Sequence, residues 1–438
     1  MAGEWPKATI AEVAERVAMG PFGSSIKVST FVEQGIPVIS GQHLRGSRLE
    51  DNKFNFVSEA HADSLKNANV FQGDVVFTHA GNIGQCAYIP ETSKFSRYVL
   101  SQRQFYVRCN KSKVLPEFIT CFFKSAAGRH ALLANASQTG VPSIARPVTY
   151  VRTIEIPLPP LPEQRSITSI LGNLDDLIEL NRETNEILEE MARALFKSWF
   201  VDFDPVRAKL EGRPPAGMDA ATAALFPDHF QDSELGQIPK GWSVGKFGDV
   251  CASSRQGVSP EQIDPDTPYI GLEHMPRRSI ALGEWETAAK VSSGKSAFNK
   301  GDILFGKLRP YFHKVGVAPV NGVCSTDILV LLPKKPDWFG FVLGHASSDA
   351  LVQFADQSSA GTKMPRTNWK DMSSFQITIP PQNVASAFSQ IVRSQVETIQ
   401  ESIFESRDLA TLRDTLLPKL LSGEVSAPGA EELIAAST

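Results

Sequence analysis

The sequence predicts a mixed α+β protein in which one globular design occurs twice, each copy followed by a long helix. Three observations lead to this fold class. The chain has 438 residues, which is long enough for two or three domains. Short motifs recur in the same order in both halves. In each half, a Pro-Pro pair separates a strand-rich region from a helical pattern.

Four motifs of the first half return roughly 220 to 230 residues later, as in repeat proteins with loop insertions. The matched segments are PVISGQHL (37–44) with PYIGLEHM (268–275), Gly73-Asp74 with Gly301-Asp302, TGVPSI (139–144) with AGTKMP (360–365), and IPLPP (156–160) with ITIPP (377–381). A Gly-Asp pair before an apolar run is by itself a common turn into a strand. Four matches in one order indicate an internal duplication.

Within the globular parts, VIS, DVVF and QFYVRC have strand texture, whereas FITCFF and RHALLANA are helical or mixed. A long helix is expected from about Glu163, directly after the first Pro-Pro, to about Trp199. Its apolar residues alternate steps of three and four, as in the seam of a coiled coil. The seam residues are Ile167, Leu171, Leu174, Ile178 and Leu188, and in the second half Ile391, Val392, Val396, Ile399, Ile403, Leu409, Leu412, Leu416 and Leu420.

Two asparagines, Asn181 and Asn185, interrupt the first seam. A single buried polar residue can fix the register of paired helices. Alternatively, both asparagines lie on a solvated edge, and the pattern leaves the two interpretations open.

These patterns divide the chain into six parts. We expect a first globular domain at 1–160, a central helix at 161–200, a linker-like connector at 201–237, a second globular domain at 238–381, a distal helix at 382–425 and a flexible tail at 426–438.

Composition excludes several classes of protein. No apolar run approaches the roughly 20 residues needed to span a bilayer, and acidic residues occupy the place of a secretory core, so we expect a cytoplasmic protein. The five cysteines form no C-x-x-C pair, so no metal site is expected. The net charge of −4 is unusual for a free-standing nucleic-acid binder. A DNA-binding function would therefore need local basic loops or a partner.

No catalytic motif is evident, and no catalytic residue is predicted. SSGKS at 292–296 resembles the end of a phosphate-binding loop, but Ala289 stands where that motif needs its first glycine. Asp202-Phe-Asp-Pro205 has the wrong order for the tetrad of an amino-group methyltransferase.

Five longer stretches carry a specific resemblance: IPLPPLPEQRSI (156–167), ARALFKSWFVDFDPVRAKLEG (192–212), GQIPKGW (236–242), GDILFGKLRPYFHKVG (301–316) and LRDTLLPKLLSGEV (412–425). In this order, and over nearly the whole chain, they resemble the specificity subunits of type I restriction-modification systems. One small departure is Gln382-Asn383 after the second Pro-Pro, where the family usually has an acidic residue and glutamine.

The resemblance implies two target-recognition domains, each of which reads one half of a split, asymmetric DNA site. It also implies that the two long helices form an antiparallel coiled coil with pseudo-two-fold symmetry, which acts as a spacer. Two methyltransferase subunits and two motor-nuclease subunits would be the partners. S-adenosylmethionine, ATP and Mg²⁺ would be bound by those partners and not by this chain, and adenine N6 would be the methylated atom.

Base recognition needs donors and acceptors on loops, with Arg, Lys, Gln and Asn favoured. In the first domain we expect contacts from Ser24, Ser25, Lys27, Gln42, His43, Arg45, Thr78, His79, Asn82, Gln138, Thr139, Ser143 and Arg146. In the second we expect them from Arg255, Gln256, Glu273, His274, Arg277, Arg278, Lys307, Arg309, Tyr311, His313, Lys314, Lys363 and Arg366. Any of these can instead be an exposed loop residue without such a role, and His43 and His274 can be histidines that are hydrogen-bonded locally.

An aromatic cluster closes the first helix, and two interpretations of it remain open. As an exposed patch it would dock the methyltransferase, and as core it would pin the connector. Its members are Phe196, Trp199, Phe200 and Phe203.

The main alternative function for the chain is a duplicated coiled-coil adaptor that binds protein or carbohydrate. A specificity chain that serves a methyltransferase without a nuclease is a second alternative.

Overall fold

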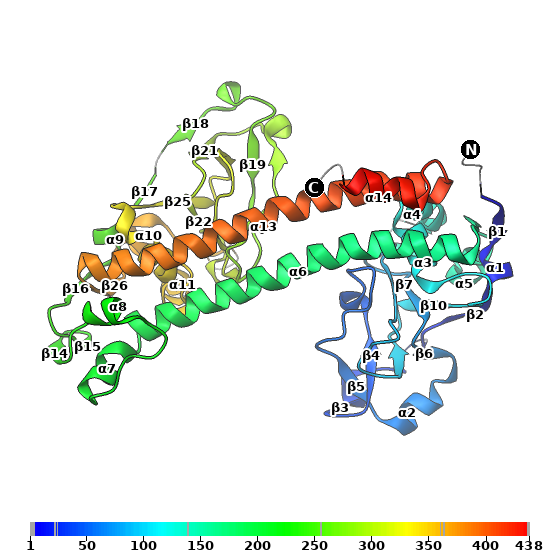
Figure 1. Cartoon of the computed structure of the whole chain (residues 1–438), viewed down its shortest axis with the longest axis horizontal. Helices are drawn as coiled ribbons and strands as arrows, with labels where there is room; N and C mark the ends of the chain where they lie inside the picture. The colour runs from blue at the N-terminus through cyan, green and yellow to red at the C-terminus, as the bar shows by residue number, and fades with distance from the viewer. Residues whose placement is uncertain are drawn as a thin grey trace. The chain divides into compact units, whose positions relative to one another are not determined.

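The computed structural model describes residues 5–21, 23, 25–137, 140–254, 256–359, 361 and 364–435, which form two compact units. Unit 1 comprises Met1–Ile178 and Asp408–Thr438, and unit 2 comprises Glu179–Arg407. The unit boundaries fall inside the two longest helices, α6 (Leu161–Phe200) and α13 (Gln382–Ser422). Each long helix therefore contributes to both units (Figure 1).

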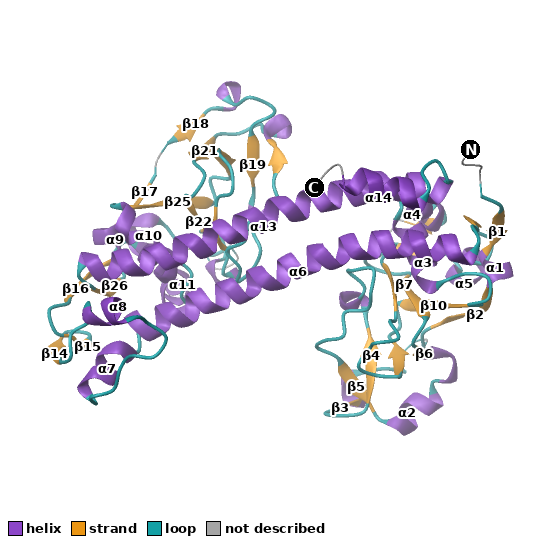
Figure 2. Ribbon diagram, in the orientation of Figure 1, coloured by secondary structure: helices purple, strands orange, loops and turns teal. Residues whose placement is uncertain are grey.

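Unit 1 is built on two small sheets (Figure 2). The first has four antiparallel strands in the order β2-β10-β7-β8, and the second has the order β3-β5-β4-β9-β6, in which β4 and β9 are parallel. The strands are β1 (Lys7–Thr9), β2 (Ala14–Met19), β3 (Phe31–Val32), β4 (Ile36–Ile39), β5 (Asn55–Val57), β6 (Asn69–Phe71), β7 (Asp74–Thr78), β8 (Cys86–Tyr88), β9 (Arg97–Leu100), β10 (Gln104–Cys109), β11 (Ala136–Ser137), β12 (Ser143–Ile144) and β13 (Glu155–Pro157). The short helices are α1 (Ile10–Val13), α2 (Glu59–Ser64), α3 (Pro116–Lys124), α4 (Ala126–Leu133), α5 (Pro147–Val151) and α14 (Ala427–Ala435), with 3₁₀ turns η1 (Val28–Thr30), η2 (Gly41–His43) and η3 (Lys66–Ala68).

Unit 2 repeats this topology. Its four-stranded sheet has the order β17-β25-β22-β23, and its second sheet, β18-β21-β24-β19-β20, again contains one parallel pair, β19 with β24. The strands are β14 (Phe230–Ser233), β15 (Gly236–Pro239), β16 (Ser243–Lys246), β17 (Cys251–Ser253), β18 (Gly257–Val258), β19 (Pro268–Ile270), β20 (Glu286–Thr287), β21 (Lys295–Phe298), β22 (Ile303–Gly306), β23 (Val315–Val317), β24 (Gly322–Cys324), β25 (Ile328–Pro333) and β26 (Gln376–Ile379). The short helices are α7 (Asp204–Leu210), α8 (Ala220–Ala224), α9 (Phe247–Val250), α10 (Phe339–Ala346), α11 (Asp349–Gln357) and α12 (Trp369–Met372), with 3₁₀ turns η4 (Pro260–Gln262), η5 (Leu272–His274), η6 (Ala288–Lys290), η7 (Pro310–Phe312) and η8 (Pro336–Trp338).

The predicted duplication is confirmed by this shared strand order. The segments with strand texture form β4, β7 and β10, and the two segments of helical or mixed texture form α3 and α4. The five-stranded sheets differ at both edges: the outermost strand β3 pairs with β5 in unit 1, whereas in unit 2 the additional strand β18 pairs with β21 at the opposite edge. Divergence of the two copies is thus concentrated at the periphery of the repeated fold.

The long helices supply part of the core of each unit. In unit 1, Ile167, Leu171 and Leu174 of α6 and Leu416 and Leu420 of α13 are buried in one cluster with the four-stranded sheet and α3. In unit 2, the carboxy-terminal part of α6 and the amino-terminal part of α13 play this role. Burying one large apolar side chain stabilises a fold by about 1.5–3 kcal/mol, so the helix ends contribute substantially to the stability of both units.

The helices run antiparallel within each unit. In unit 1, Asp175 of α6 pairs with Arg413 of α13 at 2.8 Å, whereas the earlier residue Glu163 accepts a hydrogen bond from the backbone of the later residue Ala427. In unit 2, Asn181 donates to Glu405 at 2.9 Å.

Asn185 is buried in unit 2, so it does not lie on a solvated edge. That observation favours the interpretation in which a polar seam residue sets the register, which remains a prediction.

Two expectations about the connector and the tail need correction. The connector carries α7, α8 and the β14–β15 hairpin, and it buries Phe203, Val206 and Phe226 against the core of unit 2. The predicted flexible tail contains α14, whose residues Ala427 and Ala430 are buried in unit 1. Small side chains allow this helix to pack closely, a signal that composition alone does not reveal.

Among the described residues, no helix combines the length and the apolar character that a membrane span requires.

The aromatic cluster at the end of α6 belongs to the core, so its predicted role as an exposed docking patch is corrected. Phe196, Trp199, Phe200 and Phe203 are all less than a tenth exposed, and Trp199 is 2% exposed. Phe200 packs edge-on against Phe341 and Phe388, with ring centroids 4.9 Å apart in both pairs. Large rings at the end of an amphipathic helix are buried here because the folded connector and α10 cover them.

Substitution of Trp199 by Ala is therefore expected to lower the free energy of unfolding by about 3–5 kcal/mol, because it removes a fully buried ring. Met191→Ala on the same helix is the control: Met191 is 55% exposed, and we expect a change within about 0.5 kcal/mol. Chemical denaturation of both variants measures the difference. An unchanged free energy of unfolding in the Trp199→Ala protein would contradict the assignment of this cluster to the core.

Candidate nucleic-acid interface

The same turn follows the first strand of the parallel pair in both units. In unit 1, His43 accepts a hydrogen bond at Nδ1 from the Ser40 backbone at 3.0 Å, and in unit 2, His274 accepts one from the Gly271 backbone at the same distance. Both histidine side chains are buried or nearly so. They close the turns η2 and η5, which expose Gln42 and Glu273, so the predicted DNA contacts of these two histidines are corrected to a structural role.

A second pair of loops meets beside the turn in unit 1. Gly81 donates to the Pro142 carbonyl and Ile144 donates to the His79 carbonyl, both at 2.9 Å. These bonds bring the predicted residues His79 and Asn82 together with Ser143 and Arg146. An added Cβ on Gly41 would lie 3.6 Å from Thr78 Oγ1, so the turn of η2 lies against the same loop.

Unit 2 makes equivalent contacts with different side chains. Arg309 donates through its backbone to the Pro365 carbonyl at 2.7 Å, and Thr367 donates to the Lys307 carbonyl at 3.0 Å. The guanidinium of Arg277 stacks on Phe312 with 3.9 Å to the ring centroid, which joins the η5 turn to this loop. Lys307, Arg309, Arg277 and Arg366 therefore belong to one surface region, together with the half-exposed Tyr311 that packs against Phe312.

Several of these residues have unusual backbone conformations. Arg146, Arg278, Arg309 and His313 have φ values of 45°, 58°, 50° and 51°, in the left-handed region. That conformation costs a residue with a side chain roughly 1–2 kcal/mol. In the matching hydrogen bonds, Arg309 takes the place of Gly81 of unit 1, which has φ 85°. Such strain is concentrated at functional loops in many proteins.

Sequence analysis missed the turn between β9 and β10. Arg103 of this turn is exposed, and its backbone carbonyl accepts from His79 at 2.9 Å. The equivalent residue in unit 2 is Asp327, whose carbonyl accepts from Lys307 and whose carboxylate pairs with Arg366 at 3.0 Å. A comparison of the two repeats, with attention to basic residues, would have identified Arg103.

Three further predicted residues are engaged within the fold, and two of them are buried. Thr78 is 2% exposed, and His313 is 7% exposed with Nε2 2.9 Å from the Ser347 carbonyl. Burial also lowers the pKa of His313 and of Lys314. Lys314 uses its ammonium inside the fold, since Nζ donates to the Leu272 carbonyl at 2.5 Å. For these three side chains, the predicted DNA contact is corrected to a structural role.

The remaining predicted residues fall into two groups. The first group is open to solvent: Lys27, Arg45 and Gln256 are exposed, and Ser25 is partly exposed. Within the described part of the chain, no backbone hydrogen bond joins Gln256 to the loops above. The other group lies outside the described residues, namely Ser24, Gln138, Thr139, Arg255 and Lys363.

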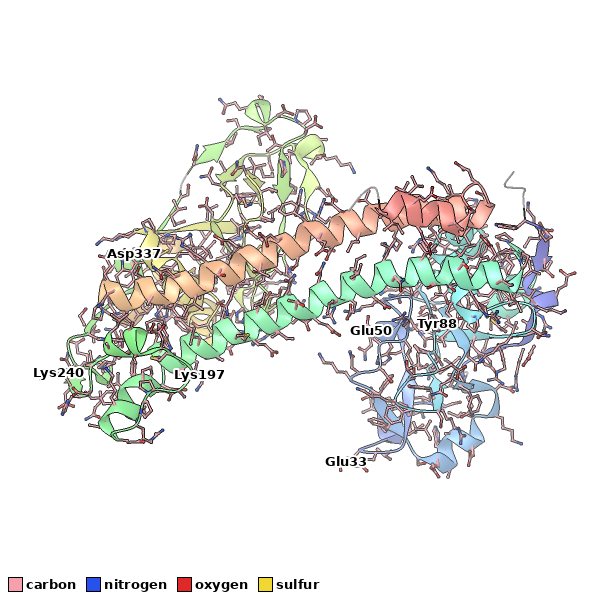
Figure 3. All side chains as sticks on the ribbon, in the orientation of Figure 1. Glu33, Glu50, Tyr88, Lys197, Lys240 and Asp337 are labelled. Carbon is pink, nitrogen blue, oxygen red and sulfur yellow. The ribbon has the colours of Figure 1, made fainter. Side chains whose placement is uncertain are left out.

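Carboxylates of α6 hold the segment that follows the η2 turn in unit 1. Ser47 donates to Asp175 at 2.7 Å, and Arg48 forms two hydrogen bonds with Asp176. Arg48 also donates to the hydroxyl of Tyr88 at 3.0 Å, a residue labelled in Figure 3. The Arg48–Asp176 pair is half exposed and therefore contributes little stability, but it restricts the direction of the loop.

The equivalent segment of unit 2 is held by a buried carboxylate. Glu189 of α6 is 4% exposed and accepts from Ser279 Oγ at 2.7 Å and from the Ala281 backbone at 3.2 Å. Burial raises the pKa of the Glu189 carboxyl, and the hydrogen bonds that it accepts offset part of this rise. Arg193, one turn further along α6, donates to the Arg278 carbonyl at 2.9 Å. In both units, α6 thus anchors the segment directly after a predicted base-reading turn.

Comparison with known proteins identifies the family. The model of the "Type I restriction modification DNA specificity domain" matches residues 3–190 and 239–403, which are the two repeated segments. The chain belongs to this family. The predicted resemblance to its members is confirmed.

Relatives within the specificity family are distant in sequence but match over most of their length. The HindI specificity subunit of Haemophilus influenzae is 24% identical, with 81% of this chain and 87% of that protein aligned. The MjaIX specificity subunit of Methanocaldococcus jannaschii is 26% identical over 72% of this chain and 70% of that protein. The crystal structure of a type I restriction-modification S subunit from M. genitalium has a TM-score of 0.53 at 14% identity, with 96% of each chain covered, and so shows the fold.

Replacing Glu189 by Leu is expected to loosen the segment 277–283 of this specificity-family chain. The substitution removes the acceptor of the Ser279 hydroxyl and leaves the Ala281 N–H with only its longer bond to Ser279 Oγ at 3.3 Å, at a cost of about 1–3 kcal/mol for an unsatisfied group. Hydrogen–deuterium exchange should therefore rise in 277–283. Glu189→Gln keeps an accepting oxygen and should exchange like the wild type.

Glu186→Leu is the matched control on the same helix, because the Glu186 side chain is 61% exposed and pairs with Arg182 of the same helix. Equal exchange in the Leu and Gln variants, or an equal effect of the control, would contradict the anchoring role.

Proposed function

We propose that this chain is the DNA-recognition subunit of a type I restriction-modification enzyme and that each unit reads one part of a split site. The observation that carries the proposal is the match of both repeated segments to the DNA specificity domain family. Equivalent loops of both units expose side chains suited to base contacts, such as Gln42 in unit 1 and Arg277 in unit 2.

The two units have different chemistry at equivalent positions, which supports an asymmetric target. Gly81 of unit 1 corresponds to Arg309 of unit 2, and Arg103 corresponds to Asp327. A positive side chain and a negative one present different hydrogen-bonding groups to a base edge. The two half-sites read by such surfaces would therefore differ in sequence.

In this proposal the chain has no catalytic role, as the names of its relatives as specificity subunits suggest. Two methyltransferase subunits would supply S-adenosylmethionine, and two motor-nuclease subunits would supply ATP and Mg²⁺. A complex that modifies and cleaves cellular and incoming DNA would act in the cytoplasm. Phosphate contacts from partners would also compensate for the net charge of −4.

The docking surface for the methyltransferase would lie on the exposed face of α6 in unit 2. Leu180, Ile187 and Met191 are each more than half exposed, and their spacing of seven and four residues places them on one face of the helix. Exposed apolar side chains in such a row are typical of helix-packing interfaces. This stripe replaces the buried aromatic cluster as the candidate docking site.

Co-expression of the chain with the methyltransferase encoded beside it tests the function. Single-molecule sequencing of the host genome should show adenine methylation at one split motif with a fixed gap. Expression of either protein alone serves as the control and should leave that motif unmethylated. A stable complex that methylates no motif would contradict the proposal and favour the duplicated adaptor.

A further inference from the structure

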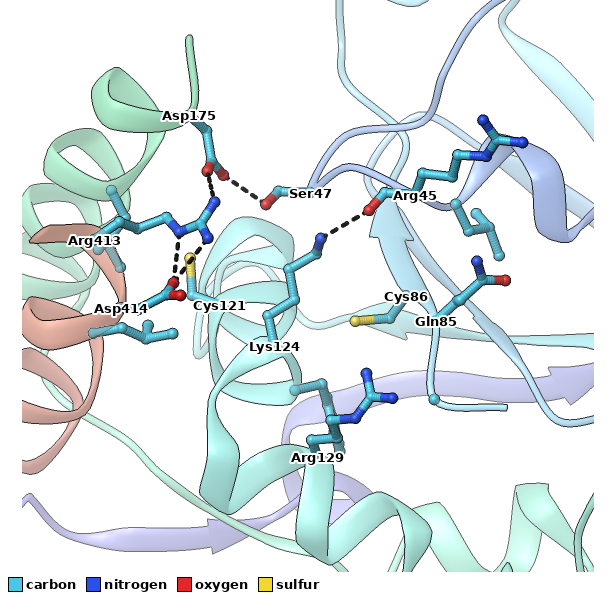
Figure 4. A pocket seen from close by; sticks show the side chains of 15 residues that line it. Arg45, Ser47, Gln85, Cys86, Cys121, Lys124, Arg129, Asp175, Arg413 and Asp414 are labelled. Atoms are coloured by element: carbon cyan, nitrogen blue, oxygen red, sulfur yellow. Dashed lines mark hydrogen bonds and ion pairs between the residues drawn. The ribbon is translucent and has the colours of Figure 1, made fainter. Parts of the chain in front are cut away.

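Unit 1 contains a polar cavity of about 300 Å³ next to the η2 turn (Figure 4). Its wall is formed by the segment after this turn, the start of β8, the helices α3 and α4, and the parts of α6 and α13 that belong to unit 1. The charged side chains that line it are Arg45, Lys124, Arg129, Asp175, Arg413 and Asp414.

On one side of the cavity, the two acidic side chains form an ion-pair network with Arg413. Arg413 donates to Asp175 at 2.8 Å and to Asp414 at 2.8 Å, and Asp175 also accepts from Ser47 (Figure 4). Both acidic side chains of the lining are thus occupied by Arg413. Because the network joins one positive and two negative groups, the charged side chains of the lining leave the cavity with an excess of positive charge, which comes from Arg45, Lys124 and Arg129.

Three cations remain, and they come from different segments. Arg45 lies on the loop after η2, Lys124 ends α3 and Arg129 lies in α4. Lys124 Nζ donates to the Arg45 carbonyl at 3.3 Å, which places the two residues together. For the guanidinium groups of Arg45 and Arg129, no hydrogen bond or ion pair is recorded within the described part of the chain.

Lys124 and Arg129 both act electrostatically on Cys86, which lines the cavity. Both lower the pKa of the buried Cys86 thiol, although burial is stronger and raises that pKa to about 11. The cavity therefore combines a positive potential with room for a ligand group of several atoms.

Unit 2 has a cavity at the equivalent place, about 320 Å³ in volume, with a different character. Counted from the serines that cap α4 and α11, Lys124 corresponds to Ser347 and Arg129 to Val352. The basic side chains of its lining are engaged: Arg278 pairs with Asp349 at 3.0 Å, Lys197 pairs with Asp202, and Arg193 donates to the Arg278 carbonyl at 2.9 Å. Among the described residues, basic side chains with neither an ion-pair nor a hydrogen-bond partner are thus a property of the unit 1 cavity and not a consequence of the shared fold.

We propose that Arg45, Lys124 and Arg129 bind a phosphate of the DNA backbone next to the base-reading turn of unit 1. Arginine and lysine are the usual donors to phosphate, and contacts of this kind fix the register of a protein on the duplex. Arg45 shares the loop that exposes Gln42, so a phosphate held here would hold the strand beside a predicted base contact. The inference rests on the proposed DNA-reading function.

Salt dependence of DNA binding tests this site in the intact complex with the methyltransferase. Each phosphate contact contributes about 0.9 to the slope of log K against log salt concentration. Because the site holds one phosphate, we expect the Lys124→Ala/Arg129→Ala variant to reduce the slope by about 1 and Arg129→Ala alone to reduce it by less. The loss should be equal for a duplex with the methylated motif and for a scrambled duplex, because phosphates carry no sequence information.

Two control variants accompany the test. Arg129→Lys keeps the charge and should keep the slope. Arg165→Ala removes an exposed arginine of α6 that does not line the cavity, and it should also leave the slope unchanged. Size-exclusion chromatography of each variant with the methyltransferase checks assembly.

Two results would overturn the phosphate site, and a third would contradict the proposed function instead. An unchanged slope in the double variant, with the complex intact, overturns it. Loss of assembly in the same variant means that the cavity holds an acidic segment of the partner subunit instead. A wild-type complex that binds its motif and the scrambled duplex equally well refutes the proposed function itself, which is a separate failure.

Discussion

Packing of the two long helices into the core of each unit is the interaction on which the rest of the structure depends. The four-stranded sheet of unit 1 is covered by Ile167 and Leu171 of α6 together with Leu416 of α13. In unit 2, Trp199 and Phe388 belong to the corresponding core. A helix end that fills the core cannot shift without a change in the sheet, because protein interiors are close-packed. The predicted reading loops are therefore built on a rigid base.

The same helix also anchors the loops directly. Asp175 in unit 1 and Glu189 in unit 2 accept hydrogen bonds from the serine that follows each predicted reading turn. The conserved element of the duplication is this arrangement of strands, helix and anchor. What differs is the set of side chains exposed around it, including the cationic cavity of unit 1 and its apolar counterpart in unit 2. A duplicated scaffold with divergent loops suits a protein that reads two unlike sequences.

The sequence was sufficient for the architecture because the signals were periodic. The steps of three and four in α6 and α13, and the ordered motif matches, predicted two repeated domains with long helices. The same pattern could not show that Phe196 and Trp199 are buried, because the connector that covers them has a linker-like composition. Nor could it separate the buried His43 from the exposed Gln42, which are neighbours on one turn. Arg103 and Arg129 were missed because their positions beside the predicted loops arise only from tertiary contacts.

Exchange of one recognition fold tests the central claim, that each unit reads its own half-site from a shared helical base. Residues 243–379, between the β14–β15 hairpin and α13, would be replaced by the aligned segment of the Haemophilus influenzae HindI specificity subunit. Adenine methylation would then be mapped in cells that also express the methyltransferase. The account predicts that one half of the split motif changes while the other half stays the same. A change in both halves, or an unaltered motif, would contradict it.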